Sequence, residues 1–292
     1  MKGNQKPDQH HHAARRSAGR HWYKDKKKLG AAVAVGLIVA VGGIAHYMQN
    51  RQERAAFLMT PPDMIPGNAE LMSYAMPRGK AGYQQHCASC HGEDMKGHPF
   101  KGIPDLVDND FLYGSGRVSE IERIIMYGIR SGNSKGWDLA SMPAFGRENP
   151  YPRYKVVSLG PQELHDIVSY IYAFRHKPTT DAEKKSIARG GIIWRGYLKG
   201  VCWDCHANDA KGDTAIGAPN LTDNIWLYGD GSRQWIYDSI AFGLHGYSPA
   251  FINRLPPETI RAIAVYLHSK LPKPATPKKK ADLKTANAGA TR

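Results

Sequence analysis

Two kinds of hydrophobic pattern follow one another along the chain. The first is an unbroken apolar run at 29–48, which contains no charged residue. The second is a set of segments with apolar residues at helical spacing. These segments are 78–91, 118–132, 160–174, 187–206, 232–244 and 256–270. Ser119 and Ser232 are the predicted N-caps of the segments at 118–132 and 232–244. No convincing strand-like alternation occurs, so the pattern predicts an all-α protein that follows one N-terminal hydrophobic helix.

The apolar run has the length of a membrane span, because a helix of about 20 residues crosses the hydrocarbon core of a bilayer. The basic segment RHWYKDKKK at 20–28 precedes it. Positively charged residues stay on the cytoplasmic side. We therefore predict a cytoplasmic tail at 1–28, a transmembrane anchor at 29–48 and a linker at 49–74. A cleaved signal peptide is the alternative, but the run is longer than a typical signal core and no clear A-x-A site follows it.

Most of the net positive charge lies in the two terminal segments of the chain. The net charge is +14, of which residues 1–28 carry +7 and residues 270–292 carry +6. Residues 29–269 are nearly neutral at +1. A basic protein often binds nucleic acid, but a neutral folded part argues against that class of partner. We expect 271–292 to be a basic, disordered tail.

The four cysteines fall into two identical frames, CASCH at 87–91 and CWDCH at 202–206. Four cysteines commonly form two disulfides or bind one zinc ion. The histidine after each pair decides against both, because C-x-x-C-H attaches haem c through two thioethers and offers an imidazole to the iron. The sequence therefore predicts two covalently bound haem c groups. Their attachment residues are Cys87, Cys90, Cys202 and Cys205.

The frames belong to a longer internal repeat with an offset of 115 residues. The register holds without a gap from His91 and His206 to Gly128 and Gly243. The first copy then has nine additional residues before a shared Pro-Ala-Phe. We predict two haem domains of one type, at 75–180 and 185–270.

His91 and His206 are the predicted proximal iron ligands. A ligating imidazole needs an acceptor at its other ring nitrogen, which fixes its tautomer and orientation. Pro104 and Pro219 each follow their histidine by 13 residues, and their carbonyls are the predicted acceptors. The alternative is that both are only turn prolines.

In the first copy, Met142 of SMPAFG is the predicted sixth ligand, since a thioether suits an electron carrier by raising its reduction potential. Met126 is the competitor, but it lies in an apolar helical stripe where methionine usually packs in the core.

In the second copy, Ser248 stands where the first has Met142, and no methionine follows Met142 in the chain. We expect His245 to replace it and the second haem to have the lower potential. An open or water-bound site, Tyr247 and His268 are the alternatives.

The chain resembles the dihaem subunit (CcoP/FixP) of cbb3-type cytochrome c oxidases. The resemblance covers roughly 75–270 and rests on DLVDNDFLYGSG and MPAFG in the first copy and GAPNLTDNIWLYG and LPPETIRAIAVYLHSK in the second. It implies two tandem class I cytochrome c domains after the anchor. The residues that match the family's first haem site are Cys87, Cys90, His91 and Met142. Those that match its second site are Cys202, Cys205 and His206.

The resemblance also implies a function. We expect an electron-transfer subunit of the bacterial inner membrane with its haem domains in the periplasm. It would pass single electrons from a quinol-oxidising complex or a soluble cytochrome c to a terminal oxidase. Rival hypotheses are a haem-based oxidoreductase and a sensor, each using an open haem in the second domain.

Overall fold

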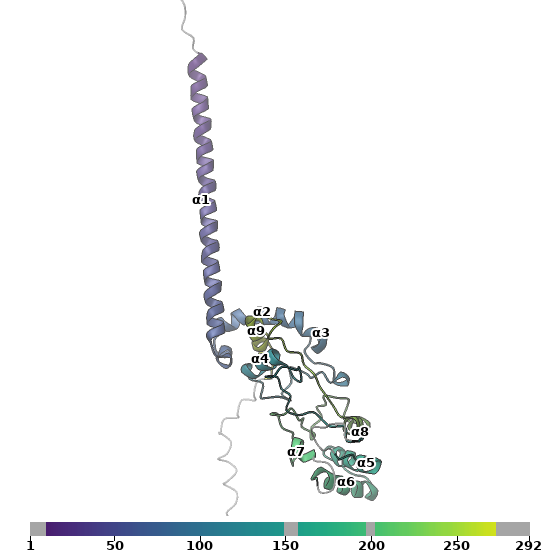
Figure 1. The fold of residues 1–292 in the computed structure, drawn as a ribbon. Helices are drawn as coiled ribbons and strands as arrows, with labels where there is room; N and C mark the ends of the chain where they lie inside the picture. The colour runs from purple at the N-terminus through teal and green to yellow at the C-terminus, as the bar shows by residue number, and fades with distance from the viewer. Residues whose placement is uncertain (1–9, 149–156, 197–201, 273–292) are drawn as a thin grey trace, which may run out of the picture. The chain divides into compact units, whose positions relative to one another are not determined.

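The computed structural model describes residues 10–148, 157–196 and 202–272. The chain divides into two compact units, 1–56 and 57–292, which are described separately. Within the described residues, regular structure consists of helices, together with five isolated β-bridges (Figure 1). The predicted all-α fold is therefore confirmed. The predicted tail at 273–292 lies outside the described residues.

The long helix α1 (His10–Met59) contains the predicted anchor. Its segment Val33–Met59 is long and apolar enough to cross a membrane, with a mean hydropathy of 1.3, and none of the most apolar part is buried. The helix begins within the predicted tail 1–28 and ends within the predicted linker 49–74. Helical structure thus extends beyond the apolar run on both sides.

The second unit consists of short helices joined by loops. Its elements are η1 (Pro62–Gly67), α2 (Ala69–His86), α3 (Ala88–His91), η2 (Pro99–Lys101), α4 (Val118–Tyr127), α5 (Pro161–Tyr172), α6 (Asp181–Trp194), α7 (Cys202–His206), α8 (Arg233–Phe242) and α9 (Pro257–His268). The helix predicted at 187–206 is divided, because α6 ends at Trp194 and residues 197–201 lie outside the described part.

Equivalent helices of the repeat end in the same way. The helices α4 and α8 stop at Gly128 and Gly243, each with a φ of 71°. An L side chain is disfavoured in this left-handed region. Each helix is therefore shorter than its apolar pattern predicted, and each glycine starts a change of direction.

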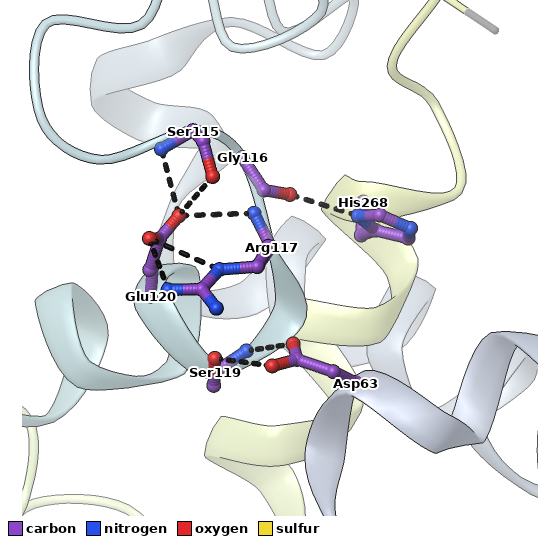
Figure 2. A network of polar contacts seen from close by, with 7 residues as sticks. All are labelled: Asp63, Ser115, Gly116, Arg117, Ser119, Glu120 and His268. Atoms are coloured by element: carbon purple, nitrogen blue, oxygen red, sulfur yellow. Dashed lines mark hydrogen bonds and ion pairs between the residues drawn. The ribbon is translucent and has the colours of Figure 1, made fainter. Parts of the chain in front are cut away.

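The helix starts differ between the copies. Ser232 caps α8 as predicted, since its hydroxyl accepts a hydrogen bond from the Trp235 backbone N–H at 3.4 Å. The prediction that Ser119 caps α4 was wrong. Figure 2 shows that Ser119 instead donates its hydroxyl to Asp63 at 2.7 Å, while the Glu120 carboxylate accepts from the Arg117 backbone N–H at 3.2 Å. A carboxylate from the first turn thus takes the place of a hydroxyl cap.

The helices pack across the repeat. The first copy's N-terminal helix α2 packs against the second copy's C-terminal helix α9, which also contacts α4. Reciprocally, the first copy's C-terminal helix α5 packs against α6 and α8 of the second copy. We call the group α2, α3, α4 and α9 the first compartment and the group α5, α6, α7 and α8 the second (Figure 1).

The boundaries predicted from the repeat, 75–180 and 185–270, therefore separate two sequence copies but not the two packed compartments. Glycines bring the crossing helices close together. A Cβ added at Gly79 would lie 2.1 Å from the carbonyl oxygen of Ala262. One added at Gly190 would lie 2.2 Å from that of Asp166. Both helix pairs thus depend on a residue without a side chain.

Candidate functional site

The first C-x-x-C-H motif lies at the junction of α2 and α3, in the first compartment. Cys87 ends α2 and its amide donates to the Tyr83 carbonyl at 2.8 Å, so the motif continues directly from the helix. The Tyr83 hydroxyl donates to the Gly92 carbonyl at 2.7 Å and closes the turn after His91. Cys87 packs at the edge of a buried cluster that includes Tyr266 and Leu267 of α9. Both copies of the repeat therefore surround this motif.

The second motif forms α7 in the second compartment. His206 is buried, and its Nδ1 lies 3.1 Å from the Pro219 carbonyl. A carbonyl only accepts, so Nδ1 carries the proton in this contact and Nε2 is left with its lone pair. The buried Trp194 ring lies 6.1 Å from the His206 ring. This is the geometry that orients an imidazole as a metal ligand.

The first proximal histidine is held less directly. His91 Nδ1 is buried and makes no hydrogen bond within the described residues. Burial lowers the pKa of His91, and the nearby Pro104 carbonyl opposes that shift. The Pro104 carbonyl therefore lies close to the His91 ring without the geometry of a full hydrogen bond, and its role as the acceptor stays a prediction. Burial also lowers the pKa of His206, against the effect of Pro219. Both rings are thereby kept neutral, which is the ligating form.

The cysteines fit thioether attachment better than disulfides or a zinc site. All four are free thiols. Burial, with a smaller effect of Cys90, raises the pKa of Cys87 to about 11, and burial raises that of Cys202 to about 12. Within the described residues, no group of three or more metal-binding side chains converges.

Two buried donors that the sequence analysis missed lie in the second compartment. Arg175 Nη2 and Trp194 Nε1 are buried and make no hydrogen bond within the described residues. Arg175 also donates to the Leu221 carbonyl and lies over the Trp226 ring at 4.4 Å. Unsatisfied N–H donors among apolar side chains suit a ligand that is largely apolar but carries carboxylates, such as a porphyrin with its two propionates. No spacing in the sequence marks either residue, so this signal comes from packing. The residues present therefore fit haem c.

Met142 lies in the second compartment. Its side chain is half-buried and packs at the edge of the cluster that also includes Cys202, Leu221 and Trp226. Its backbone N–H donates to the Leu244 carbonyl at 3.2 Å, and its carbonyl accepts from the Leu244 N–H at 3.1 Å. The predicted ligand of the first motif is thus found among residues of the second copy.

The candidates proposed for the second iron lie elsewhere. Ser248 is paired with Ile129 through both backbone groups, at 2.9 and 3.0 Å. His245 and Tyr247 are exposed in the same loop. Figure 2 shows that His268 donates from Nδ1 to the Gly116 carbonyl at 2.8 Å, which fastens α9 to the segment before α4. The structure therefore places the residues of 245–248 and His268 beside the first copy.

Met126, the competitor of Met142, lies near the end of α4. Its carbonyl accepts hydrogen bonds from the amides of Phe251 and Ile252, at 3.2 and 3.0 Å. It thus contacts the second copy's Pro-Ala-Phe segment through its backbone.

The chain is similar to known proteins over most of its length. A cytochrome c family model matches residues 76–173. FixP, a cbb3-type cytochrome c oxidase subunit of Bradyrhizobium sp. (strain ORS 278), is 36% identical over 205 residues, which is 70% of this chain and 64% of that protein. CcoP subunits are 30% identical in Cereibacter sphaeroides, over 75% of this chain and 69% of that protein, and 32% identical in Azospirillum brasilense, over 73% and 68%.

The chain spans somewhat less than two thirds of the FixP relative and somewhat more than two thirds of the two CcoP relatives. The cofactor that fits this family and the two C-x-x-C-H motifs is covalently bound haem c, two per chain. Together the motifs, the fold and these matches show that the chain belongs to the CcoP/FixP family of cbb3-type cytochrome c oxidase subunits.

Proposed function

We propose that this chain is a membrane-anchored dihaem cytochrome that passes single electrons between a respiratory donor and a terminal oxidase. The observation that carries the proposal is the presence of two C-x-x-C-H histidines, both kept neutral by burial, in a chain of the CcoP/FixP family. Each bound haem c supplies a one-electron Fe(III)/Fe(II) couple. The donor is a quinol-oxidising complex or a soluble cytochrome c, and the acceptor is the oxidase that such subunits belong to.

The chain's own residues attach, orient and enclose the haems. The thiols of the two cysteine pairs form the thioethers, and Nε2 of His91 and His206 binds the two irons. Pro219 keeps the His206 ring in one tautomer through its hydrogen bond. Met142 gives one iron a thioether, and His245 is the candidate for the other. Buried side chains around both motifs exclude water, which limits reorganisation when the charge on the iron changes.

The proposed location is the bacterial inner membrane, with the second unit in the periplasm. The apolar segment Val33–Met59 supports an anchor. The basic residues before it support a cytoplasmic N-terminus. Covalent haem attachment is compatible with an exterior compartment, since all four cysteines are needed as thiols and none is used in a disulfide.

The test is purification of the full chain from its native membrane in mild detergent. We expect two haem c per chain by haemochrome assay, coelution with a terminal oxidase, and full reduction by the donor of that oxidase. Cys87→Ser together with Cys202→Ser, the matched control, should lower the covalent haem content. A chain that elutes without an oxidase and binds carbon monoxide at half of its haem would instead support the oxidoreductase or sensor hypothesis.

A further inference from the structure

A groove lies between helices α5 and α8 of the second compartment, and we call it the α5–α8 groove (Figure 1). Its volume is about 240 Å³, and it is lined by His165, Val168, Ser169, Arg233, Gln234 and Tyr237. Val168 and Ser169 are buried beneath it. His165 and Gln234 are exposed at its edges. A buried floor with a polar rim is the usual layout of a protein–protein interface.

The repeat identifies the equivalent place in the first compartment, which we call the α4–α9 groove. Helices α5 and α9 begin at Pro161 and Pro257. In that register Ile167 corresponds to Ile263, and α8 corresponds to α4 at the offset of 115 residues. The equivalents of the six lining residues, in the same order, are Arg261, Ala264, Val265, Val118, Ser119 and Glu122.

The α4–α9 groove is filled by residues 57–65 of the same chain. Phe57 and Ile65 are fully buried there, in one hydrophobic cluster. The cluster includes three of the six equivalents, which are Val118, Ala264 and Val265. The segment therefore covers the apolar part of this groove.

Arg261 holds the same segment through its backbone. It donates to the carbonyls of Phe57 at 3.1 Å, Leu58 at 2.6 Å and Thr60 at 3.1 Å. The buried Glu122 carboxylate accepts from Arg261 at 3.1 Å and fixes the guanidinium. These carbonyls lie in the last turn of α1 or just after it, where a helix offers them no donor of its own.

A carboxylate makes the remaining contact with the α4–α9 groove. Figure 2 shows that Asp63 accepts from the backbone N–H of Ser119 at 2.9 Å and from its hydroxyl at 2.7 Å. This groove therefore receives the C-terminal end of a helix, with an aromatic side chain in the last turn and a carboxylate after it.

The α5–α8 groove offers the same kinds of group. His165 replaces Arg261 and provides an N–H donor for a carbonyl. The backbone N–H of Gln234 lies in the first turn of α8, where no acceptor exists within the helix, as for Ser119 at the start of α4. The Tyr237 ring, 5.6 Å from the His165 ring, adds an apolar wall.

The charge of the α5–α8 groove is balanced from within. Arg233 pairs with Glu183, donates to the Ser169 hydroxyl at 3.2 Å and lies over the Tyr172 ring at 4.2 Å. The groove therefore does not require a strongly charged occupant.

The second copy contributes no segment of its own to this groove among the described residues. Helix α2 is preceded by the end of α1 and by η1, but residues 173–180 join α5 directly to α6. The repeat thus duplicates the groove without duplicating the helix end that fills it.

We infer that the α5–α8 groove binds the C-terminal end of a helix from a partner protein. An aromatic side chain of its last turn packs on Val168 and Tyr237, a terminal carbonyl accepts from His165, and a carboxylate after the helix accepts from the start of α8. The inference goes beyond the proposed function, because it depends on no haem and no electron transfer.

A different protein fits this role better than a second copy of the chain. Phe57 and Ile65 of each copy are already fully buried in that copy's own α4–α9 groove. A second copy would have to expose these side chains before it could fill the α5–α8 groove, at a cost of several kcal/mol.

The first experiment uses a probe taken from the chain itself. A synthetic peptide of residues 50–66, with photoreactive benzoylphenylalanine in place of Phe57, is irradiated with the full chain in detergent. Mass spectrometry maps the adducts. We expect them on α5 or α8, because the tethered segment already fills the α4–α9 groove. Adducts only on α4 or α9, or no adduct, would overturn the inference.

A charge variant tests the contact with the carboxylate of the peptide. Gln234→Glu places a like charge at the start of α8, so we expect about tenfold less adduct. Gln84→Glu on the exposed side of α2 is the matched control and should leave the yield unchanged. Equal yields from the two variants would contradict the proposed contact.

The second experiment looks for the partner in the native membrane. Benzoylphenylalanine is introduced at Gln234 of the full chain, and at Gln84 as the control. We expect an adduct from position 234 alone, mapped to the last turn of a helix in another protein. An adduct to residues 57–65 of a second copy, an adduct elsewhere in a partner, or no adduct would overturn the inference.

The haem content of the same samples separates the two proposals. A chain that forms the adduct but carries no covalent haem contradicts the proposed function and supports the groove. A chain with two haems that copurifies with an oxidase but forms no adduct supports the proposed function and contradicts the groove.

Discussion

His206 and His91 occupy equivalent positions in the repeat, but their surroundings differ. The Nδ1 atom of His206 lies 3.1 Å from the Pro219 carbonyl, whereas that of His91 has no hydrogen-bond partner within the described residues. On the distal side, Met142 enters the second compartment and Ser248 the first. The second compartment therefore has an imidazole fixed by a hydrogen bond together with the Met142 side chain, whereas the imidazole of the first compartment makes no such bond.

The difference teaches which parts of a repeat can diverge. The glycine turns, the Pro-Ala-Phe segments and the reciprocal backbone pairs are the same in both copies, because each maintains the other's loop. The side chains at positions 142 and 248 are not constrained by that geometry, since Met142 and Ser248 make their pairs through the backbone. The proposed ligand position can therefore change without loss of the fold.

The largest effect should come from the ligand positions themselves. Met142→Ala removes the thioether. We expect complete loss of the near-infrared charge-transfer band of ferric haem with a methionine ligand, a lower potential for one haem and new carbon monoxide binding at half of the haem. Redox titration and the ferrous spectrum with carbon monoxide measure these changes. Ser248→Met is the reciprocal variant and should raise the potential of the other haem. Unchanged spectra in both variants would contradict the role of these loops.

The next effect concerns the arginines that hold the C-terminal helices. Arg261 of α9 pairs with the buried Glu122 at 3.1 Å and donates to the carbonyls of Phe57, Leu58 and Thr60. Arg261→Met leaves these groups without their donor, so we expect a loss of about 3 kcal/mol in the free energy of unfolding. Urea unfolding of the full chain in detergent measures it.

Arg189→Met is the matched variant in the second compartment. Arg189 pairs with the buried Asp166 at 2.6 Å, but Asp166 also accepts from Ser186 at 2.6 Å and from Gln162 at 3.1 Å. Because two donors remain, we expect a smaller loss of about 1–2 kcal/mol. If Arg189→Met loses as much unfolding free energy as Arg261→Met, or more, the expected difference between the two ion pairs is contradicted.

Helix crossing gives a third comparison. Gly79→Ala and Gly190→Ala each place a Cβ within about 2 Å of a carbonyl oxygen of the opposite helix. Alanine normally stabilises a helix relative to glycine by up to about 1 kcal/mol, but this collision outweighs that gain. We expect each variant to lose about 2 kcal/mol. Gly67→Ala, whose Cβ would meet nothing within 4 Å, is the control and should change stability by less than about 0.5 kcal/mol.

The smallest effect is a pH dependence at the start of α4. Although burial opposes it, hydrogen bonds from Arg117 and Ser115 lower the pKa of Glu120 to about 2. Because the pKa of Glu120 is lower in the folded state, its ionised carboxylate stabilises the fold at pH values above about 4.5. That stability is lost as the pH falls from about 4.5 through 2. We expect Glu120→Gln to reduce the difference in unfolding free energy between pH 5 and pH 3 by about 1–2 kcal/mol.

Urea unfolding at pH 5 and pH 3 measures the slope. The equivalent helix start in the second copy combines the Ser232 hydroxyl with the carboxylate of Asp230, which accepts from the Ser232 backbone N–H at 2.9 Å. Hydrogen bonds from Ser232 lower the pKa of Asp230, but this carboxylate is exposed. We therefore expect Ser232→Ala to cost about 1 kcal/mol, with less change between pH 5 and pH 3 than Glu120→Gln produces. An equal change for the two variants would remove the contrast between the two helix starts.

The sequence predicted the helices and the two motifs well, because the C-x-x-C-H frame and the apolar stripes are local patterns. It failed where a distant residue decides the structure. Ser119 does not cap α4 because Asp63 binds its hydroxyl and Glu120 occupies the helix start. The packing of α2 against α9, and of α5 against α6, could not be predicted from the sequence either. Helices α5 and α9 carry equivalent apolar stripes, and the repeat does not specify which of them packs against α2 and which against α6.

The packing of α2 against α9 has a consequence for the order in which the protein is completed. The helix that carries the first motif is synthesised early, but its partner helix is the last one of the described chain. The second compartment needs nothing after Phe242 for its four helices. A chain emerging from its N-terminus can therefore enclose its second haem before its first, and truncation of the last helix would disrupt the compartment that was started first.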